Sequence, residues 1–185
     1  MIWIIVIVVV LALVAFGVVG FNKLRATDVG AQEALGGIDV QLTRRADLVP
    51  NLVETVKGYA AHEKTVLENI TNARAKVQQA AQSDDVPAKA EADAALTGAL
   101  ANLNVVAENY PDLKANQNFL DLQRQLADTE NQISFARQYY NDAVATLNTL
   151  TRTIPWMLFT GIAGVHSRDF YQAPEGQDQA PQVSF

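Results

Sequence analysis

The chain has 185 residues, no cysteine, and 20 acidic against 14 basic side chains, which gives a net charge of −6 at pH 7. The lack of cysteine excludes a disulfide framework and any thiolate-based zinc or redox chemistry. The acidic balance and the scattering of the basic residues argue against a protein that binds nucleic acid.

Residues 2–21 contain no charged side chain and no proline. A helix rises about 1.5 Å per residue, so this run spans about 30 Å, the thickness of the hydrocarbon core of a bilayer. The alternative is a cleaved secretory signal, which has a basic start, a shorter apolar stretch and a small-residue cleavage site. None of these features is present, because no basic side chain precedes the run and Gly20-Phe21 is followed by Asn22. We therefore expect residues 1–21 to form an uncleaved transmembrane anchor.

Two basic residues, Lys23 and Arg25, directly follow the apolar run, whereas no basic side chain precedes it. Positive residues next to a span favour the cytoplasmic side of the membrane. The expected topology is a single pass with the N-terminus outside and the soluble domain in the cytoplasm.

Residues 22–165 are rich in alanine, leucine, glutamine and asparagine and show no strand-like alternation, which predicts an all-α domain. Apolar residues recur every seven positions along two segments, the pattern of a coiled-coil stripe. The first stripe contains Arg45 and Glu63 among Leu35, Leu42, Val49, Val56, Ile70 and Val77. The second contains Phe119, Leu126, Ile133, Tyr140, Leu147 and Ile154, with Leu122, Thr129, Ala136, Ala143 and Leu150 as companions. These stripes predict an antiparallel bundle of three to four long helices, similar to a four-helix bundle.

Three sites punctuate the expected helices. Residues 83–87 and 109–112 combine capping side chains with Pro87 and Pro111, so a helix should stop at each. Pro50 should bend the first segment, since its ring clashes with the carbonyl of Ala46, but the stripe keeps its register across it. The chain reversal between Pro50 and Glu63 is therefore expected near residues 58–62.

Two C-terminal segments differ from the helical domain. Residues 154–165 are uncharged but too few to span a bilayer. They either close one end of the bundle or contact the membrane surface or another subunit, in which case Trp156 and Phe159 are the candidate contacts. Residues 166–185 form the expected C-terminal tail, which becomes rich in glutamine, proline and glycine from residue 173 and is expected to be disordered.

Several polar side chains lie on or beside the apolar stripes, and a charge there needs a partner from a facing helix. Arg45 is expected to meet Glu130 or Asp128, and Glu63 to meet Arg137 or a tyrosine hydroxyl. One interpretation is a buried polar network that sets the register of the helices. The other is a surface that binds a partner or a second subunit. The residues assigned to this structural polar network are Arg44, Arg45, Glu63, Glu130, Arg137 and Asn141.

Five motifs occur in a fixed order along the chain. They are IDVQLTRRADLVPNL at residues 38–52, VKGYA at 56–60 followed by His62-Glu63, YPDLKAN at 110–116 with Phe119, ENQI at 130–133, and ARQYYNDAV at 136–144. Together they resemble the LemA family, apart from Gln138, where the family commonly has a second arginine, and Ala46, often a larger polar residue. The resemblance implies a bacterial helical bundle with an N-terminal anchor in the inner membrane and a cytoplasmic domain. Some relatives are associated with the formation of magnetosome membranes, and the family has no active site to carry over.

No catalytic, cofactor-binding or metal-binding constellation is evident in the sequence. His62 and His166 are the only histidines, and no Glu-x-x-His spacing, phosphate-binding glycine loop or serine nucleophile motif occurs. We therefore expect a non-enzymatic scaffold without cofactor that binds the lipid bilayer, forms a homo-oligomer and organises or shapes membranes or membrane complexes. The alternative is a membrane-tethered adaptor that recruits an unidentified protein partner through the bundle surface or the C-terminal tail.

Overall fold

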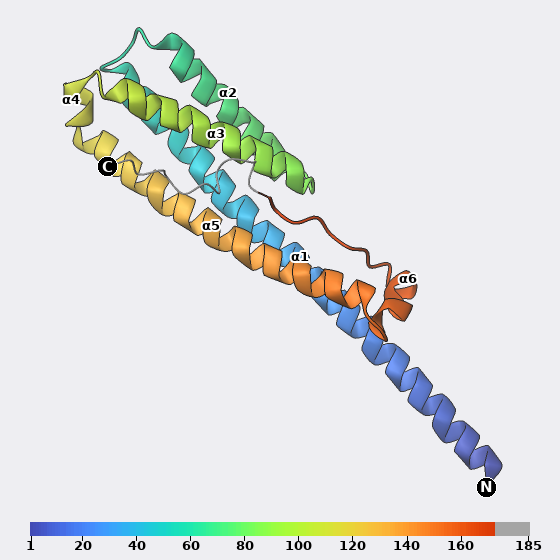
Figure 1. Ribbon diagram of the computed structural model, residues 1–185. Coiled ribbons are helices and arrows are strands. Elements are labelled where there is room, and N and C mark those ends of the chain that lie inside the picture. The colour runs from blue at the N-terminus through green and yellow to red at the C-terminus, as the bar shows by residue number, and fades with distance from the viewer. Residues whose placement is uncertain (173–185) are drawn as a thin grey trace, which may run out of the picture. The chain divides into compact units, whose positions relative to one another are not determined.

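The computed structural model describes residues 1–172, which contain helices and no strand. The all-α prediction is therefore confirmed. The order of elements is α1 (Ile2–Lys57), α2 (Lys64–Ala81), α3 (Val86–Ala107), α4 (Pro111–Lys114), α5 (Gln117–Arg152), the 3₁₀ helix η1 (Trp156–Phe159) and α6 (Thr160–Ala163) (Figure 1). Residues 173–185 of the predicted tail lie outside the described part of the chain.

The chain divides into two compact units. Unit 1 contains residues 1–36 and 138–170, and unit 2 contains residues 37–137 together with the described residues 171 and 172. The long helices α1 and α5 each contribute one part to each unit.

Unit 2 contains four longer helical segments, namely the end of α1, α2, α3 and the beginning of α5, and the short helix α4. Figure 1 shows α2 and α3 side by side, and the chain turns back between α1 and α2 at residues 58–63, where the reversal was expected. The heptad stripes supply the core, because leucine, isoleucine and valine at their positions point away from solvent. The buried residues include Ile38, Leu42, Val49, Leu52, Val56, Leu67, Ile70, Val77, Leu96, Leu103, Leu126 and Ile133.

The predicted helix boundaries have identifiable caps. The Asp85 side chain accepts a hydrogen bond of 3.0 Å from the backbone N–H of Ala88 at the start of α3, and Pro87 occupies the first turn. The Asn116 side chain accepts one of 3.0 Å from the N–H of Phe119 at the start of α5. Each cap satisfies a backbone donor that has no partner within its helix.

Pro50 lies inside α1, and the helix continues past it to Lys57, as the unbroken stripe predicts. Proline has no N–H, so the carbonyl of Ala46, one turn earlier, loses its usual helical partner. Ala46 is fully buried, and Arg74 of α2 donates from its Nε to this carbonyl at 3.0 Å. A side chain of a neighbouring helix therefore replaces the missing hydrogen bond.

We expect Arg74→Ala to lower the free energy of unfolding by about 1–3 kcal/mol, because it leaves a buried carbonyl without a donor. In a Pro50→Ala background, the backbone N–H at position 50 can donate to the Ala46 carbonyl. Arg74→Ala should then lower the free energy of unfolding by clearly less. Urea unfolding in mild detergent, followed by far-UV circular dichroism, measures this cycle. Arg124→Ala, which removes an exposed ion pair with Asp121, is the matched control. Equal costs in both backgrounds would contradict the assignment.

Unit 1 contains the apolar start of α1, the end of α5 and the segment that follows it. The most apolar 18-residue window of α1 has no buried residue, so its side chains are available to lipid, and α1 is long and apolar enough to cross a membrane. Beyond this window a buried stripe faces inward, with Leu24, Ala31, Ala34 and Leu35 on α1 and Tyr140, Val144, Leu147 and Leu150 on α5. Ile154 continues the predicted heptad but is exposed, because α5 ends at Arg152.

Candidate functional site

Helix α3 brings two charged side chains into the core of unit 2. Its buried stripe contains Leu96, Leu100 and Leu103, and the same spacing of three and four residues extends back to Asp93 and Lys89. Both charged residues are fully buried. Neither residue was predicted from the sequence, although extending the leucine stripe toward the start of α3 would have placed two charges on its apolar face.

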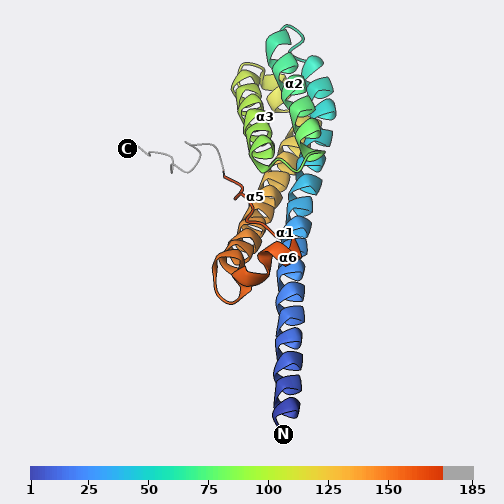
Figure 2. The same ribbon diagram turned by 90° about the vertical axis from the view of Figure 1, so that its right-hand side faces the viewer.

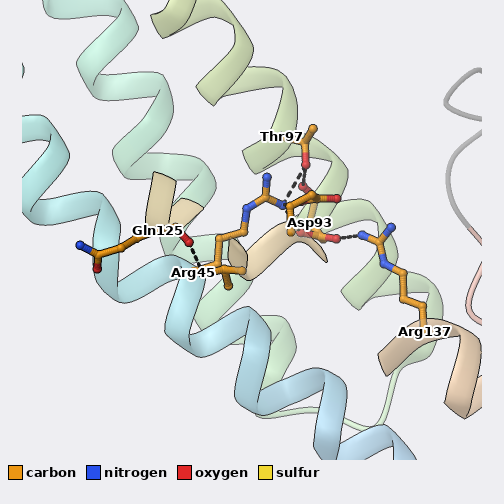
Figure 3. A network of polar contacts seen from close by, with 7 residues as sticks. Arg45, Asp93, Thr97, Gln125 and Arg137 are labelled. Carbon is orange, nitrogen blue, oxygen red and sulfur yellow. Dashed lines mark hydrogen bonds and ion pairs between the residues drawn. The ribbon is translucent and has the colours of Figure 1, made fainter. Parts of the chain in front are cut away.

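Asp93 joins two arginines that come from different helices. Arg45 of α1 donates from Nη1 to Asp93 Oδ1 at 2.7 Å and to the Thr97 hydroxyl at 3.0 Å. Arg137 of α5 donates from Nη2 to the other carboxylate oxygen of Asp93. Figure 3 shows the Asp93 carboxylate between the two guanidinium groups. One buried carboxylate thus links three helices.

Glu130 completes the cluster. Its Oε2 lies 2.7 Å from Nη1 of Arg45, so this glutamate is the one of the two acidic candidates that the structure places beside Arg45. We call Arg45, Asp93, Glu130 and Arg137 the charged quartet. Its two positive and two negative charges cancel, which is the arrangement that a low-dielectric interior tolerates best.

Burial governs the electrostatics around the quartet. Burial lowers the pKa of Arg45, although Glu130 acts in the opposite direction. The Tyr171 ring lies 5.0 Å from the guanidinium carbon of Arg137, and burial raises the pKa of the Tyr171 hydroxyl although Arg137 opposes it. Within residues 1–172, the Nε atoms of Arg45 and Arg137 are buried without a hydrogen-bond partner. The quartet is therefore neutral but not fully satisfied.

A second ion pair lies one turn earlier on α3. The ammonium group of Lys89 pairs with Asp39 of α1 and lies 3.5 Å from the carbonyl oxygen of Ala81. Burial raises the pKa of Asp39, while the hydrogen bond from Lys89 lowers it. Two ion pairs thus join α3 to α1: Arg45–Asp93, which is buried, and Lys89–Asp39, in which Lys89 is fully buried and the Asp39 side chain is 27% exposed.

The remaining residues assigned to the network lie elsewhere. Glu63 falls in the loop after α1 and accepts a 2.9 Å hydrogen bond from the Tyr110 hydroxyl, so its partner is a tyrosine and not Arg137. That hydrogen bond raises the pKa of Tyr110. Arg44 is exposed, because a residue next to Arg45 points about 100° away around the helix. Asn141 is half-buried on α5 in unit 1.

The two aromatic residues predicted as contacts lie in unit 1. The Trp156 and Phe159 rings both pack on Phe16 of α1, at centroid distances of 6.3 and 5.5 Å. Residues 166–172, assigned to the tail from sequence, also make specific contacts. Arg168 pairs with Asp28 at 2.9 Å, and its backbone exchanges hydrogen bonds with Asn148.

The chain is similar in sequence to proteins of a known family. The family model described as "LemA family" matches residues 34–185. The chain belongs to the LemA family. This match begins after the apolar run and includes the quartet. Arg45, Glu130 and Arg137 fall in motifs noted above, whereas Asp93 lies in none.

Three LemA-family relatives are magnetosome proteins by name. The chain is 24% identical over 194 residues to the magnetosome protein MamQ of Magnetospirillum gryphiswaldense, an alignment that covers 90% of this chain and 71% of the relative. It is 22% identical over 192 residues to each of MamQ 1 and MamQ 2 of Paramagnetospirillum magneticum, covering 91% of this chain and 71% of each relative.

In this LemA-family bundle, the quartet has the geometry of a structural clamp. Its charged groups face one another across α1, α3 and α5. Among residues 1–172, no group of three or more histidine, cysteine, aspartate or glutamate side chains is placed to hold a metal ion. We propose that this clamp holds the helices in one register, because a slipped register would leave charges buried and unpaired.

Proposed function

We propose that this LemA-family protein is a non-enzymatic, membrane-anchored scaffold whose bundles self-associate. The observation that carries the proposal is an aromatic side chain left in solvent on α5: Phe135 is 68% exposed. Val40 of α1 and Val105 of α3 are also exposed in the same unit. Aromatic side chains are enriched at protein–protein interfaces, and exposed apolar residues on a rigid bundle suit contact with a second copy.

The relatives support a role at membranes. Their names connect them with the magnetosome, and the apolar start of α1 supplies a means of attachment here. We propose that the protein organises or shapes a membrane or a membrane complex by linking copies that are each fixed in the bilayer. Within unit 2, the quartet would hold α1, α3 and α5 together in each copy.

The test is the mass of the full chain in detergent, measured by light scattering after size-exclusion chromatography. We expect the parent to run as an oligomer and Phe135→Glu to run as a smaller species, because a charge at an apolar contact must be desolvated. Ser134→Glu is the matched control, since Ser134 is exposed but points to another side of α5. It should leave the mass unchanged.

A monomeric parent would overturn self-association. If that monomer retained one specific protein from a membrane extract, the adaptor function would replace the scaffold. Loss of the partner in Phe135→Glu would then place the adaptor surface on the bundle.

We also propose that the protein crosses the bacterial inner membrane once, with the N-terminus outside and the bundle in the cytoplasm. Lys23 and Arg25 support this orientation. The lack of cysteine permits a direct test with Ile2→Cys and Ser134→Cys. A membrane-impermeant maleimide should label Ile2→Cys in intact cells and Ser134→Cys only after lysis. The reverse pattern would invert the topology.

A further inference from the structure

The segment after α5 packs on the part of α1 that belongs to the apolar run. Phe16 contacts both Trp156 and Phe159, with the first pair stacked at 27° and the second meeting edge to face at 66°. Figure 2 shows α6, which directly follows η1, beside α1. Phe16 lies five residues before Phe21, which is about 7.5 Å inside the end of the run. If α1 spans a bilayer, the Trp156 and Phe159 rings of η1 therefore lie at the same depth in it as Phe16.

A glycine on α1 makes this contact fit. A Cβ built at Gly20 would lie 2.5 Å from a ring carbon of Phe159, closer than side chains approach one another. One turn later, the Lys23 ammonium lies 4.4 Å from the centroid of the Trp156 ring. Trp156 thus contacts both an apolar ring and a cation, surroundings that suit the headgroup level of a membrane, where tryptophan is enriched.

The outer side of the segment is apolar. Ile154, Leu158 and Ile162 are 79%, 67% and 78% exposed, and residues 153–165 carry no charged side chain. Several of its polar groups have partners nearby in the chain: the Met157 N–H donates to the Thr153 carbonyl at 2.9 Å, and the Thr160 hydroxyl donates to the Met157 carbonyl at 2.8 Å. Internal satisfaction of this kind is what a segment in contact with hydrocarbon requires.

We propose that residues 154–163 form a second membrane element, which lies in the interface of the leaflet at the C-terminal end of the α1 span and inserts Ile154, Leu158 and Ile162 among the lipids. The inference rests on the membrane attachment in the proposed function. The occupant is the bilayer, because the patch is continuous with the lipid-facing surface of α1 through Phe16. Interfacial elements are buried by about 5–10 Å, which matches the depth of Phe16. The single-pass anchor would thus be accompanied by an interfacial element, residues 154–163, at its C-terminal end.

The two tryptophans, Trp3 and Trp156, provide separate reporters. Two variants of the full chain, Trp3→Phe and Trp156→Phe, each retain one tryptophan. Each variant is placed in phosphatidylcholine nanodiscs, whose two faces are both open to solvent. Iodide reports exposure to water, and lipids brominated near the headgroup or near the acyl terminus report depth. In Trp3→Phe, where Trp156 is the remaining tryptophan, we expect bromine near the headgroup to quench its fluorescence most. Iodide should quench it much less than it quenches a tryptophan in water.

A steric variant tests the packing on α1. In the Trp3→Phe background, Gly20→Val should displace Phe159 and restore quenching of Trp156 by iodide. Gly30→Val is the control, because a Cβ there meets no atom within 4 Å.

Three outcomes overturn the inference. The first is that Trp156 is quenched by iodide and not by brominated lipid. The second is that it is shielded from both quenchers, which would indicate that a second protein copy covers the segment. The third is that Gly20→Val leaves the quenching of Trp156 by iodide unchanged, as Gly30→Val does. If brominated lipid quenches Trp3 but not Trp156, residues 154–163 do not lie in the interface, while α1 still spans the membrane. If Trp3 is also quenched only by iodide, α1 does not span and the proposed function fails with it.

Discussion

Replacing Asp93 with asparagine should lower the free energy of unfolding by about 3–5 kcal/mol, the range for breaking a buried ion pair on one side. Asp93 is fully buried and is the acceptor for both Arg45 and Arg137. The amide keeps the shape of the side chain but removes the negative charge, so the quartet changes from neutral to a net charge of +1. Chemical unfolding of the full chain in mild detergent, followed by circular dichroism, measures the effect.

Asp121→Asn is the matched control for this change. Asp121 also pairs with an arginine, Arg124 at 2.8 Å, but here the side chains are 43% and 70% exposed. Exposed pairs contribute about 0–1 kcal/mol, so this variant should unfold close to the parent. If Asp93→Asn also unfolds with the parent, the quartet does not stabilise the bundle, and its residues would be better interpreted as part of a binding surface.

The second large effect is the recovery of stability when the buried charges are replaced by apolar side chains. We expect the triple change Arg45→Met, Asp93→Leu and Arg137→Met to recover most of the stability lost in Asp93→Asn and to come within about 2 kcal/mol of the parent. Desolvating the charges of Arg45, Asp93 and Arg137 is expensive, and apolar side chains of similar volume avoid that cost. The buried Nε atoms of both arginines add to the cost in the parent. Glu130, whose side chain is 39% exposed, can turn to water when Arg45 is lost.

The triple variant also separates stability from specificity. If the quartet sets the helix register, the stable triple variant should show poorer dispersion of its amide NMR signals than the parent, because an apolar stripe permits slipped registers. A triple variant as unstable as Asp93→Asn would show instead that the charges themselves stabilise the fold. Equal dispersion in both proteins would remove the register hypothesis.

Much of the fold was predictable from the chain alone because hydrophobic periodicity and helix punctuation are local signals. The stripes indicated α1, α2 and α5, and the proline-containing segments at residues 83–87 and 109–112 marked the ends of α2 and α3. Pro50 was correctly interpreted as a position inside one helix. The stripe itself is not a guide to chain reversal, however. It continued through Glu63, where the structure has a loop, since seven-residue spacing can persist by chance across a short break.

The candidate site was less predictable because it depends on which helices face each other. Arg45 stood out as a charge within a leucine stripe, and Glu130 was named as one of two acidic partners. Asp93 was missed because the alanine-rich α3 has a weak apolar stripe, in which a single aspartate resembles an ordinary surface residue. Tyr171 lay in residues 166–185, which were assigned to the C-terminal tail, and only the fold places it against Arg137.

The neutrality of the quartet has a consequence for the surroundings in which the bundle works. Counter-ions concentrate next to anionic lipid headgroups, so the local ionic strength there differs from that of the bulk solution. Mobile ions weaken exposed charge pairs strongly but reach buried ones poorly. A bundle stabilised by largely buried charges that sum to zero is therefore expected to unfold with nearly the same free energy at low and at high ionic strength.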